Sequence, residues 1–551
     1  MRTLGFLALI PLSAGVIGLT VGALWLVGSS SGQRERFSSL EIAPADPVFY
    51  MAINTEPSSS QWIAVKDTLE TLNAKDPIRD AIDEVLLEFN LQFERDILPL
   101  AGAEGYFAIT DIDALSTNAG GFVMAVQLRD GARAEEIFLG LPDPAEGQEE
   151  YEGETLYFDE TPDLGSDFQD LRLAFIDDTM VIGASPADAK GVIDIIHGQA
   201  PSGEGNDRLQ EMRDRQTDEF LVWGYFDMQR FLDWSEGYID GGMTPEFGSS
   251  VDTDQLLKEA RKYSDRLSFA VTAVGDGFTF DSTLLLPPDA DRSALQKAFE
   301  PELASKVPAD TLAFFSGFDP YNQGYAQARD QLESSTTPSG FDFQGIIDEI
   351  ENEIGVNIED DLLSLMTGEF GVAVNVSDFD AAPPDVEVLA AAGVSDPERV
   401  RDAVAKIGSY FEDQEMIAVT ESDSSGVELW SEFGGSGEAV AWTVHDENLV
   451  FGYPAASVNA FVDGVDESLA DSDDWKRTMD LLPGDKTFVG YMSLSRLIDE
   501  LRKMEQVEAE FERSTEGKVT FDDLSAIQSL GMAVTRFDEG YGFHVALLVK
   551  D

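Results

Sequence analysis

The sequence predicts an α+β protein with an N-terminal transmembrane helix and two duplicated halves, each a curved, mainly antiparallel sheet with helices packed on one face. Three observations predict this fold. The chain opens on an uncharged apolar run, its later landmarks recur at a spacing of about 265 residues, and short strands joined by acidic or glycine-bearing turns alternate with amphipathic helices. Such turns favour antiparallel pairing of neighbouring strands.

The first element is the apolar run from Thr3 to Gly28, which contains no charged residue. A helix needs about 20 apolar residues to cross a bilayer, so this run is long enough. A cleaved signal peptide has a shorter apolar core and a small-residue cleavage site, which Val27-Gly28-Ser29 matches poorly. We therefore expect residues 1–30 to form an uncleaved anchor, with a signal peptide as the alternative, and residues 31–39 to form a stalk.

The basic N-terminus sets the expected topology. Arg2 and the terminal amine precede the apolar run, and a short basic segment in this place usually stays in the cytoplasm. The sequence thus predicts a single-pass protein of the cell membrane, with everything after the anchor in the periplasm or at the cell surface.

The duplication appears next along the chain. Pro44-Ala45-Asp46 before one apolar strand matches Pro308-Ala309-Asp310 before another, at an offset of 264. Each is followed by an apolar helix, expected over residues 78–89 and 346–354. The segments 93–98 and 358–363 then match at an offset of 265, as do EGYFAI (104–109) and EFGVAV (369–374). We expect two α+β repeats, residues 40–300 and 301–551.

These landmarks resemble a known family. The N-terminal anchor, the Pro-Ala-Asp opening, the helix exits at Phe93–Leu98 and Ile358–Leu363, and the strand Gly368-Glu369-Phe370-Gly371 are similar to a bacterial membrane-anchored envelope family known only as domain of unknown function 3352. The resemblance implies an exported, membrane-anchored protein and supplies no catalytic residue. The first half departs from the pattern, with Ala103-Glu104 in place of Gly368-Glu369.

Composition excludes several classes of function. The chain has 105 acidic and 36 basic side chains, a net charge of −69, which argues against nucleic acid as a partner because phosphates need Lys and Arg. It has no cysteine, which excludes disulfides and thiolate metal sites. The three histidines, His197, His445 and His544, have no histidine at the matching position of the other half and no nucleophile elbow beside them, so we assign no catalytic residue and no cofactor.

Calcium is the one metal for which the sequence offers candidates. Asp111 and Asp113, and Asp378 and Asp380, follow matching strands of the two halves and supply the carboxylate oxygens that calcium prefers. Neither pair completes a calcium-binding loop, and Asp also favours turns and strand ends for local reasons.

The sequence therefore predicts a non-enzymatic binding or scaffold module, held to the membrane by its N-terminal helix, that takes an unidentified protein or an apolar ligand. Two alternatives stay open: an exported hydrolase that uses carboxylates, and a structural spacer of the cell envelope. A hydrolase would gather acids with raised pKa values in one pocket, whereas a spacer would need no pocket.

Overall fold

The computed structural model describes residues 38–73, 75, 79, 83, 86–87, 91–117, 119–140, 147–158, 171–240, 253–290, 297–321, 351–378, 385–422, 426–432, 439–515 and 520–550. The expected anchor (1–30), most of the stalk, and most of the helices expected over 78–89 and 346–354 lie outside these residues. Within the described ranges, no helix has both the length and the apolar character needed to cross a membrane.

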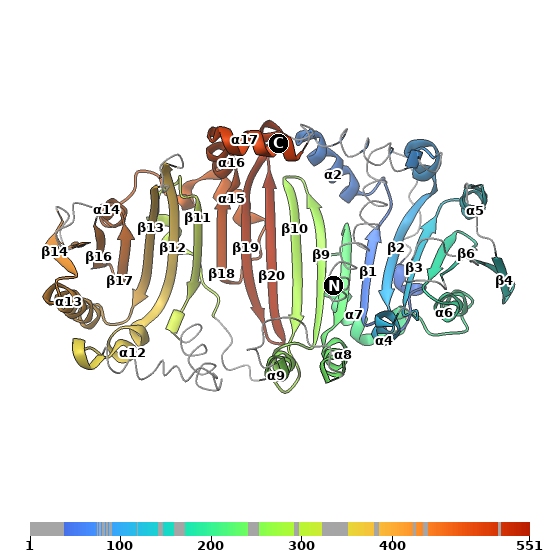
Figure 1. The fold of residues 1–551 in the computed structure, drawn as a ribbon, viewed down its shortest axis with the longest axis horizontal. Coiled ribbons are helices and arrows are strands. Elements are labelled where there is room, and N and C mark those ends of the chain that lie inside the picture. The colour runs from blue at the N-terminus through green and yellow to red at the C-terminus, as the bar shows by residue number, and fades with distance from the viewer. Residues whose placement is uncertain are drawn as a thin grey trace. The chain divides into compact units, whose positions relative to one another are not determined.

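The chain divides into two compact units. Unit 1 is Met1–Ala290 with Glu539–Tyr541 and Asp551, and unit 2 is Asp291–Asp538 with Gly542–Lys550. Each unit is described by itself below, and Figure 1 shows the strands and helices of both.

Unit 1 contains an antiparallel sheet in the order β4-β5-β6-β7-β3-β2-β1-β8-β9-β10. Its strands are β1 (Phe49–Asn54), β2 (Ala101–Ile109), β3 (Phe122–Leu128), β4 (Gly147–Tyr151), β5 (Glu154–Phe158), β6 (Arg172–Ile176), β7 (Thr179–Gly183), β8 (Val222–Asp227), β9 (Arg266–Val274) and β10 (Gly277–Leu285).

Unit 2 repeats this topology, in the order β14-β15-β16-β17-β13-β12-β11-β18-β19-β20. Its strands are β11 (Ala313–Phe318), β12 (Met366–Asp378), β13 (Asp385–Val394), β14 (Ile417–Glu421), β15 (Glu428–Glu432), β16 (Val440–His445), β17 (Asn448–Tyr453), β18 (Lys486–Ser493), β19 (Ile527–Phe537) and β20 (Gly540–Val549).

The two sheets also share their register. Glu104 lies opposite Asn54, and Glu369 lies opposite Phe318, at offsets of 265 and 264 along the chain. A one-residue slip would turn every side chain to the other face of the sheet, so equal register puts equivalent residues on equivalent faces. The duplication expected from the sequence is therefore present in the fold.

Several helices of the two units also correspond in order. Unit 1 has η1 (Ser39–Glu41), α2 (Ser60–Thr71), η2 (Phe93–Ile97), η3 (Leu98–Leu100), α4 (Ile112–Ser116), α5 (Gly131–Leu139), α6 (Pro186–Ile196), η4 (Gly203–Gly205), α7 (Asp207–Asp214), α8 (Met228–Asp240) and α9 (Thr253–Tyr263). Unit 2 has η5 (Glu302–Lys306), α12 (Ile358–Asp361), η7 (Leu363–Leu365), α13 (Pro397–Asp413), α14 (Ala455–Asp463), η8 (Leu469–Asp471), α15 (Asp473–Asp480), α16 (Leu494–Lys503), α17 (Glu505–Ser514) and α18 (Phe521–Leu524). Side-chain oxygens fix several helix starts, among them those of Ser59, Asp130, Ser185 and Ser472.

Each sheet has two apolar faces, which we name by their residues. The core face carries Tyr50, Tyr106 and Trp223 in unit 1 and Phe314, Ala373, Val489 and Tyr491 in unit 2. The aromatic face carries Phe49, Met51, Ile53 and Phe107 in unit 1 and Phe315, Val372, Phe488 and Met532 in unit 2. The alternation of side chains along a strand separates the two sets.

The expectation that helices pack on one face is wrong. Helix α6 packs on the core face of unit 1, but α5 places Ala134 in a cluster with Leu128, on the aromatic side of β3. In unit 2, α13 likewise packs Val400 and Val404 against Val394. Helices α5 and α6 both contact β6, and helices α13 and α14 both contact β16 and β17.

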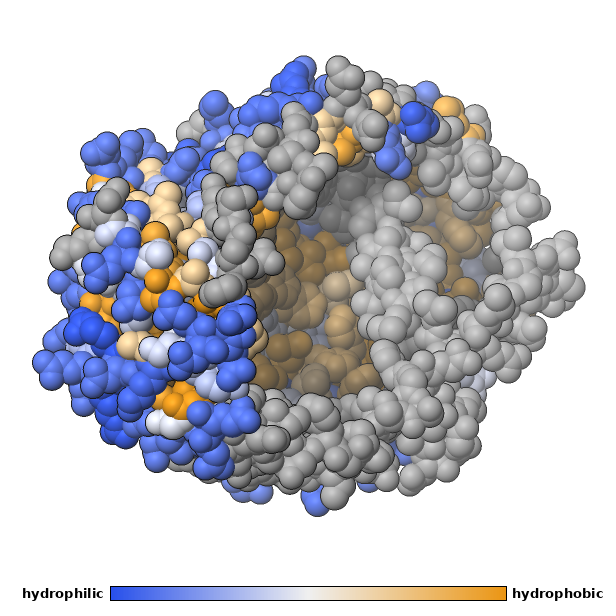
Figure 2. Space-filling model, turned by 60° about the vertical axis from the view of Figure 1, so that its left-hand side comes forward, coloured by the Kyte–Doolittle hydropathy of each residue, from blue (hydrophilic) through white to orange (hydrophobic). Residues whose placement is uncertain are grey.

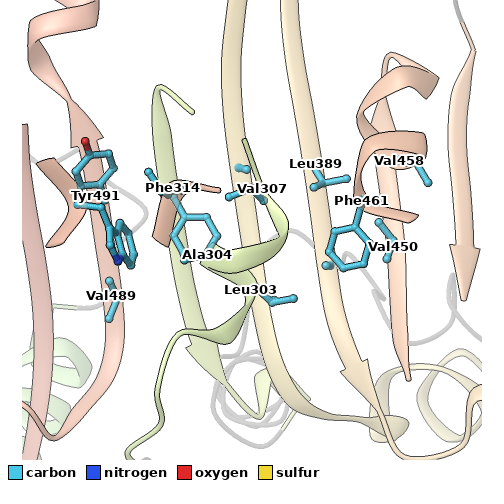
Figure 3. Close-up of a cluster of buried hydrophobic side chains, with 14 of the residues drawn as sticks. Leu303, Ala304, Val307, Phe314, Leu389, Val450, Val458, Phe461, Val489 and Tyr491 are labelled. Atoms are coloured by element: carbon cyan, nitrogen blue, oxygen red, sulfur yellow. The ribbon is translucent and has the colours of Figure 1, made fainter. Parts of the chain in front are cut away.

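The largest described core of unit 2 lies on its core face. Figure 3 shows Leu303 and Ala304 of η5, and Val307 directly after it, between Phe314 of β11 and Leu389 of β13. Leu303 and Ala304 are buried, at 5% and 0% exposed. The segment that precedes the first strand of the unit is thus part of its core.

Candidate functional site

One glutamate lies on the core face of each sheet, where the pairing of its strand with the next strand is irregular. The pairing of β2 with β3 is irregular between Ala101 and Gly105, and the pairing of β12 with β13 is irregular between Met366 and Phe370. Bulges re-aim side chains and are treated as specific features of a fold. The bulged stretches contain Glu104 and Glu369.

Glu104 binds the segment that precedes β1, the first strand of unit 1. Its Oε2 accepts a hydrogen bond of 2.8 Å from the backbone N–H of Ser39 in η1, and the Ser39 side chain is a second partner. The Ser39 hydroxyl also lies 2.5 Å from the hydroxyl of Tyr50. Tyr50 stacks on Tyr106, with 5.8 Å between ring centroids, and Tyr106 donates to the carbonyl of Ile42 at 3.0 Å.

Glu369 does the same in unit 2. Its two carboxyl oxygens lie 3.2 and 3.1 Å from the backbone N–H of Leu303 in η5, which donates to them. The Ser316 hydroxyl, from β11, donates to Oε1 at 2.6 Å and also lies 2.9 Å from the carbonyl of Phe370. In both units a carboxyl therefore binds the amide of the short helix that precedes the first strand.

Burial dominates the electrostatics of both carboxyls. Loss of water raises the pKa of Glu104 to about 7, against the hydrogen bonds from Ser39 and the positive charge of Arg213, which lower it. Burial likewise raises the pKa of Glu369 to about 7, although the bonds from Ser316 and from the η5 backbone lower it. Each carboxyl therefore changes its charge near neutral pH.

The arrangement lacks the parts of a hydrolytic site. Glycoside hydrolysis requires two carboxyls flanking a bond that substrate can reach. Glu104 and Glu369 are each committed to a backbone amide, and their neighbours Ser39 and Ser316 are 1% and 0% exposed. The better-formed hollows of the described residues are a shallow one of about 480 Å³ beside α13 and one of about 140 Å³ beneath α14, and neither glutamate lines them.

The second feature of functional interest is the aromatic face. In unit 1 a contiguous cluster joins the buried Met51, Ile53 and Phe107 with half-buried side chains of β1, β2, β3, β8 and β9: Phe49, Ile109, Phe122, Met124, Val222 and Phe269. In unit 2 the matching positions of β11, β12, β18 and β19 are Phe315, Val372, Val374, Phe488, Met532 and Val534. None of these side chains carries a charge, in a chain of net charge −69.

Glycines flatten this face. A Cβ on Gly224 would lie 2.2 Å from the ring of Phe269, and one on Gly317 would lie 2.6 Å from the ring of Phe370. Aromatic rings therefore lie directly over the backbone of these central strands. Figure 2 shows hydrophobic residues gathered together in the view turned toward the reader.

The calcium candidates occupy local structural positions. Asp111 caps α4, accepting a hydrogen bond of 3.0 Å from the N–H of Ala114, and Asp113 lies in the first turn of that helix. Asp378 ends β12 opposite Asp385, while Asp380 lies outside the described residues. Across the described part of the chain, no three Asp, Glu or His side chains gather as a metal-binding group.

The histidines lie apart and contact local partners. His197 caps the C-terminus of α6, with Nε2 3.2 Å from a carboxyl oxygen of Glu154. His544 lies in β20, with Nε2 2.9 Å from the hydroxyl of Thr535. His445 ends β16 and faces Asp446 at 3.3 Å.

Sequence reasoning did not single out Glu104 and Glu369 as site residues. A signal was present, because the two glutamates open the matching strand sequences EGYFAI and EFGVAV. An acid repeated at one register position of an otherwise apolar strand is a candidate for a buried charge. The amides that bind Glu104 and Glu369, those of Ser39 and Leu303, lie 65 and 66 residues away along the chain, so the sequence could not identify them.

The fold and these features define an internally duplicated α+β protein with one carboxyl bound to a backbone amide and one uncharged aromatic sheet face in each unit. The family model described as "Protein of unknown function (DUF3352)" matches residues 10–548, and the chain belongs to this family.

Other comparisons add little. No curated protein matches the chain. Among solved structures, crystal form III of TP0453 is 10% identical and aligns with 47% of this chain and 83% of that one, with a TM-score of 0.26. Crystal form IV of TP0453, also 10% identical, aligns with 45% and 81%, with a TM-score of 0.24. Scores this low support no argument about fold or function.

Proposed function

We propose that this protein is a membrane-anchored, extracytoplasmic binding protein without enzymatic activity, and that the aromatic face of unit 2 takes a long hydrocarbon chain such as the acyl chain of a lipid. The observation that carries the proposal is that this uncharged face is only half-buried, whereas Met51, Ile53 and Phe107 on the unit 1 face are buried. The membrane anchor and the location rest on the sequence of residues 1–30.

The two faces of unit 2 differ in exposure. On the core face, Phe314 and Val489 are 1% and 0% exposed. On the aromatic face, Phe315, Phe488 and Met532 are half-buried. Apolar surface gains about 25 cal/mol per Å² when it leaves water, so an apolar ligand that covered these side chains would bind favourably.

The chemistry of this face favours a hydrocarbon chain as the ligand. Its paired strand positions are Phe, Val, Leu, Met, Ala and Gly, which offer no side-chain partner to a polar ligand. Phe315 and Phe488 stack with 6.5 Å between ring centroids, and a Cβ on Gly490 would lie 2.9 Å from the terminal methyl of Met532. Methionine adapts its shape to flexible apolar ligands.

Binding can be tested with full-length protein in detergent and a pyrene-labelled alkyl chain that carries a neutral headgroup. We expect Met532→Ser to weaken binding about tenfold, because a buried Met contact is worth roughly 1.5–3 kcal/mol. Met416→Ser is the matched control, since Met416 lies 48% exposed beyond α13. Equal loss in both variants, or no saturable binding by the wild type, would contradict the proposed ligand.

Topology can be tested separately because the chain contains no cysteine. Asp413→Cys places a unique thiol at the exposed end of α13. We expect a membrane-impermeant maleimide to label this thiol in spheroplasts of cells that express the full chain. Labelling only after lysis would place the units in the cytoplasm and overturn the proposed location.

A further inference from the structure

Glu104 and Glu369 bind equivalent backbone amides in the two units. In unit 1, Glu104 binds the amide of Ser39, ten residues before the start of β1. In unit 2, Glu369 binds the amide of Leu303, ten residues before the start of β11. Each carboxyl thus ties the segment that opens its unit to the bulge of the second strand.

The tied segments have further contacts with their own sheets. Residues 38–46 bury Leu40 and Ala43, at 4% and 0% exposed, and Pro44 forms an isolated bridge with Ser202. Residues 301–310 bury Ala304 and Val307, at 0% and 3%, and Pro308 forms the matching bridge with Ser468.

We propose that Glu104 and Glu369 act as proton-controlled latches on the two segments that precede the first strands, residues 38–46 and 301–310. Each latch holds its segment when the carboxyl is neutral and loosens it when the carboxyl ionises. The proposal concerns regulation of the fold and does not depend on the ligand of the aromatic face.

The chemistry of the two protonation states supports a latch. A neutral carboxyl can accept the hydrogen bonds from the backbone amide and from the serine hydroxyl through its carbonyl oxygen, and it carries no charge that needs hydration. The ionised form keeps its role as an acceptor but has lost its hydration, and a buried charge is stable only when it is paired or solvated again. Opening of the segment is what readmits water to the carboxylate.

The surrounding charges do not neutralise the ionised form. Near Glu104 the charged groups are Arg213 of α7, which lowers its pKa, and Glu41 of η1, which raises it. The phenol of Tyr50 is buried, with its own pKa raised above the ordinary value. Near Glu369 the charged group is Glu302 of η5, which raises the pKa. Burial outweighs all of these, and the pKa lies at about 7 in both units.

The direction of the effect follows from linkage. An opened segment returns its glutamate to the ordinary pKa of 4.5, while the closed segment keeps it at about 7. The closed state is favoured fully below pH 4.5 and loses this advantage as the pH rises to about 7. Opening should therefore increase roughly 50-fold between about pH 5 and about pH 8.

Amide hydrogen exchange of the full chain, read by mass spectrometry and corrected for the intrinsic pH dependence of exchange, measures this opening. Peptides from residues 38–46 and 301–310 should lose protection over this pH range in the wild type. Glu104→Gln, which keeps an acceptor and a donor but cannot ionise, should keep residues 38–46 protected throughout, while residues 301–310 still respond.

Each latch is the matched control for the other, because Glu369→Gln should have the reverse effect. The pH series on the wild type requires no substitution. It therefore still tests the proposal if one of the variants misfolds. Protection that is independent of pH in the wild type, or a pH response that persists in residues 38–46 of Glu104→Gln, would overturn it.

Discussion

The carboxyl sites of the two units have the same backbone arrangement but differ in their side-chain partners. Glu104 and Glu369 share a bulge, a register position and a partner amide at the start of the unit. They differ in the hydroxyl that completes the site, which comes from Ser39 of η1 in unit 1 and from Ser316 of β11 in unit 2. The backbone geometry is common to both units, whereas the serine that bonds to the carboxyl comes from a different element in each unit.

The surroundings differ as well. Around Glu104 lie Tyr50, Tyr106 and Trp223, and Arg213 of α7 lies 5.6 Å from the Trp223 ring. The position equivalent to Tyr50 in unit 2 is Phe314, which has no hydroxyl. Because the pKa reaches about 7 in both settings, burial rather than any single neighbour is the cause.

The largest predicted effect is on the pH dependence of stability. Each glutamate has a folded pKa near 7 against an ordinary 4.5, so each should add stability below pH 4.5 that is lost as the pH rises to about 7. This contribution should be roughly 3 kcal/mol for Glu104 and smaller for the partly exposed Glu369, whose charge is screened by water. The double variant Glu104→Gln/Glu369→Gln should therefore lose much less stability than the wild type between about pH 5 and about pH 8 in urea unfolding.

The control for this prediction is a pair of exposed glutamates, one in each unit. Glu94 and Glu421 are both exposed, and Glu94→Gln/Glu421→Gln should leave the pH dependence of the wild type in place. If the buried and exposed pairs behaved alike, the two carboxyl sites would not be the source of the effect.

The next prediction separates the aromatic faces of the two units. Gly224 and Gly490 are equivalent, but a Cβ on Gly224 would meet the rigid ring of Phe269 at 2.2 Å, whereas one on Gly490 would meet the flexible end of Met532 at 2.9 Å. Gly224→Ala should destabilise by about 1–3 kcal/mol through overpacking, and Gly490→Ala by less. Thermal unfolding of the two variants measures the difference, and an equal or reversed order would show that Phe269 moves aside.

Much of this fold could be predicted from the sequence because duplication is a pattern of spacing. The matched motifs at 44–46 and 308–310 do precede the equivalent strands β1 and β11, and EGYFAI and EFGVAV do lie in the equivalent strands β2 and β12. Acidic turns such as Asp177-Asp178 and Asp446-Glu447 do join antiparallel neighbours. These features depend on local sequence alone.

The carboxyl sites and the second layer of helices could not be predicted in the same way. The bonds from Ser39 to Glu104 and from Leu303 to Glu369 join residues that only the fold brings together. Likewise, α13 has an ordinary amphipathic pattern, which cannot say which face of the sheet it will cover. Long-range partners decide both outcomes.

A smaller effect is expected from the hydroxyl of Tyr50, which the equivalent residue of unit 2, Phe314, lacks. Tyr50→Phe removes the group that lies 2.5 Å from the Ser39 hydroxyl and leaves the ring in its stack on Tyr106. It should destabilise unit 1 by about 1 kcal/mol, the usual net value of one hydrogen bond. Phe314 already lacks the hydroxyl, so Phe314→Leu serves as the control for a change of ring packing without a hydrogen bond. Calorimetric unfolding that shows no loss for Tyr50→Phe would mean that Ser39 is satisfied by Glu104 alone.

The smallest effect concerns the acids that follow the equivalent strands β2 and β12. Asp111 caps α4 through Ala114, whereas Asp378 lies within the end of β12, opposite Asp385. Asp111→Ala should cost about 0.5–1 kcal/mol as a lost helix cap, while Asp111→Asn should be nearly neutral because Asn also caps helices. Asp378→Ala should be neutral or slightly stabilising, since it removes a like charge opposite Asp385.

Urea unfolding of the three variants, with and without added calcium, distinguishes a cap from a metal ligand. A cap responds to Ala but not to calcium, and a calcium-dependent gain in wild-type stability that both Asp111→Ala and Asp378→Ala abolished would reinstate the metal interpretation.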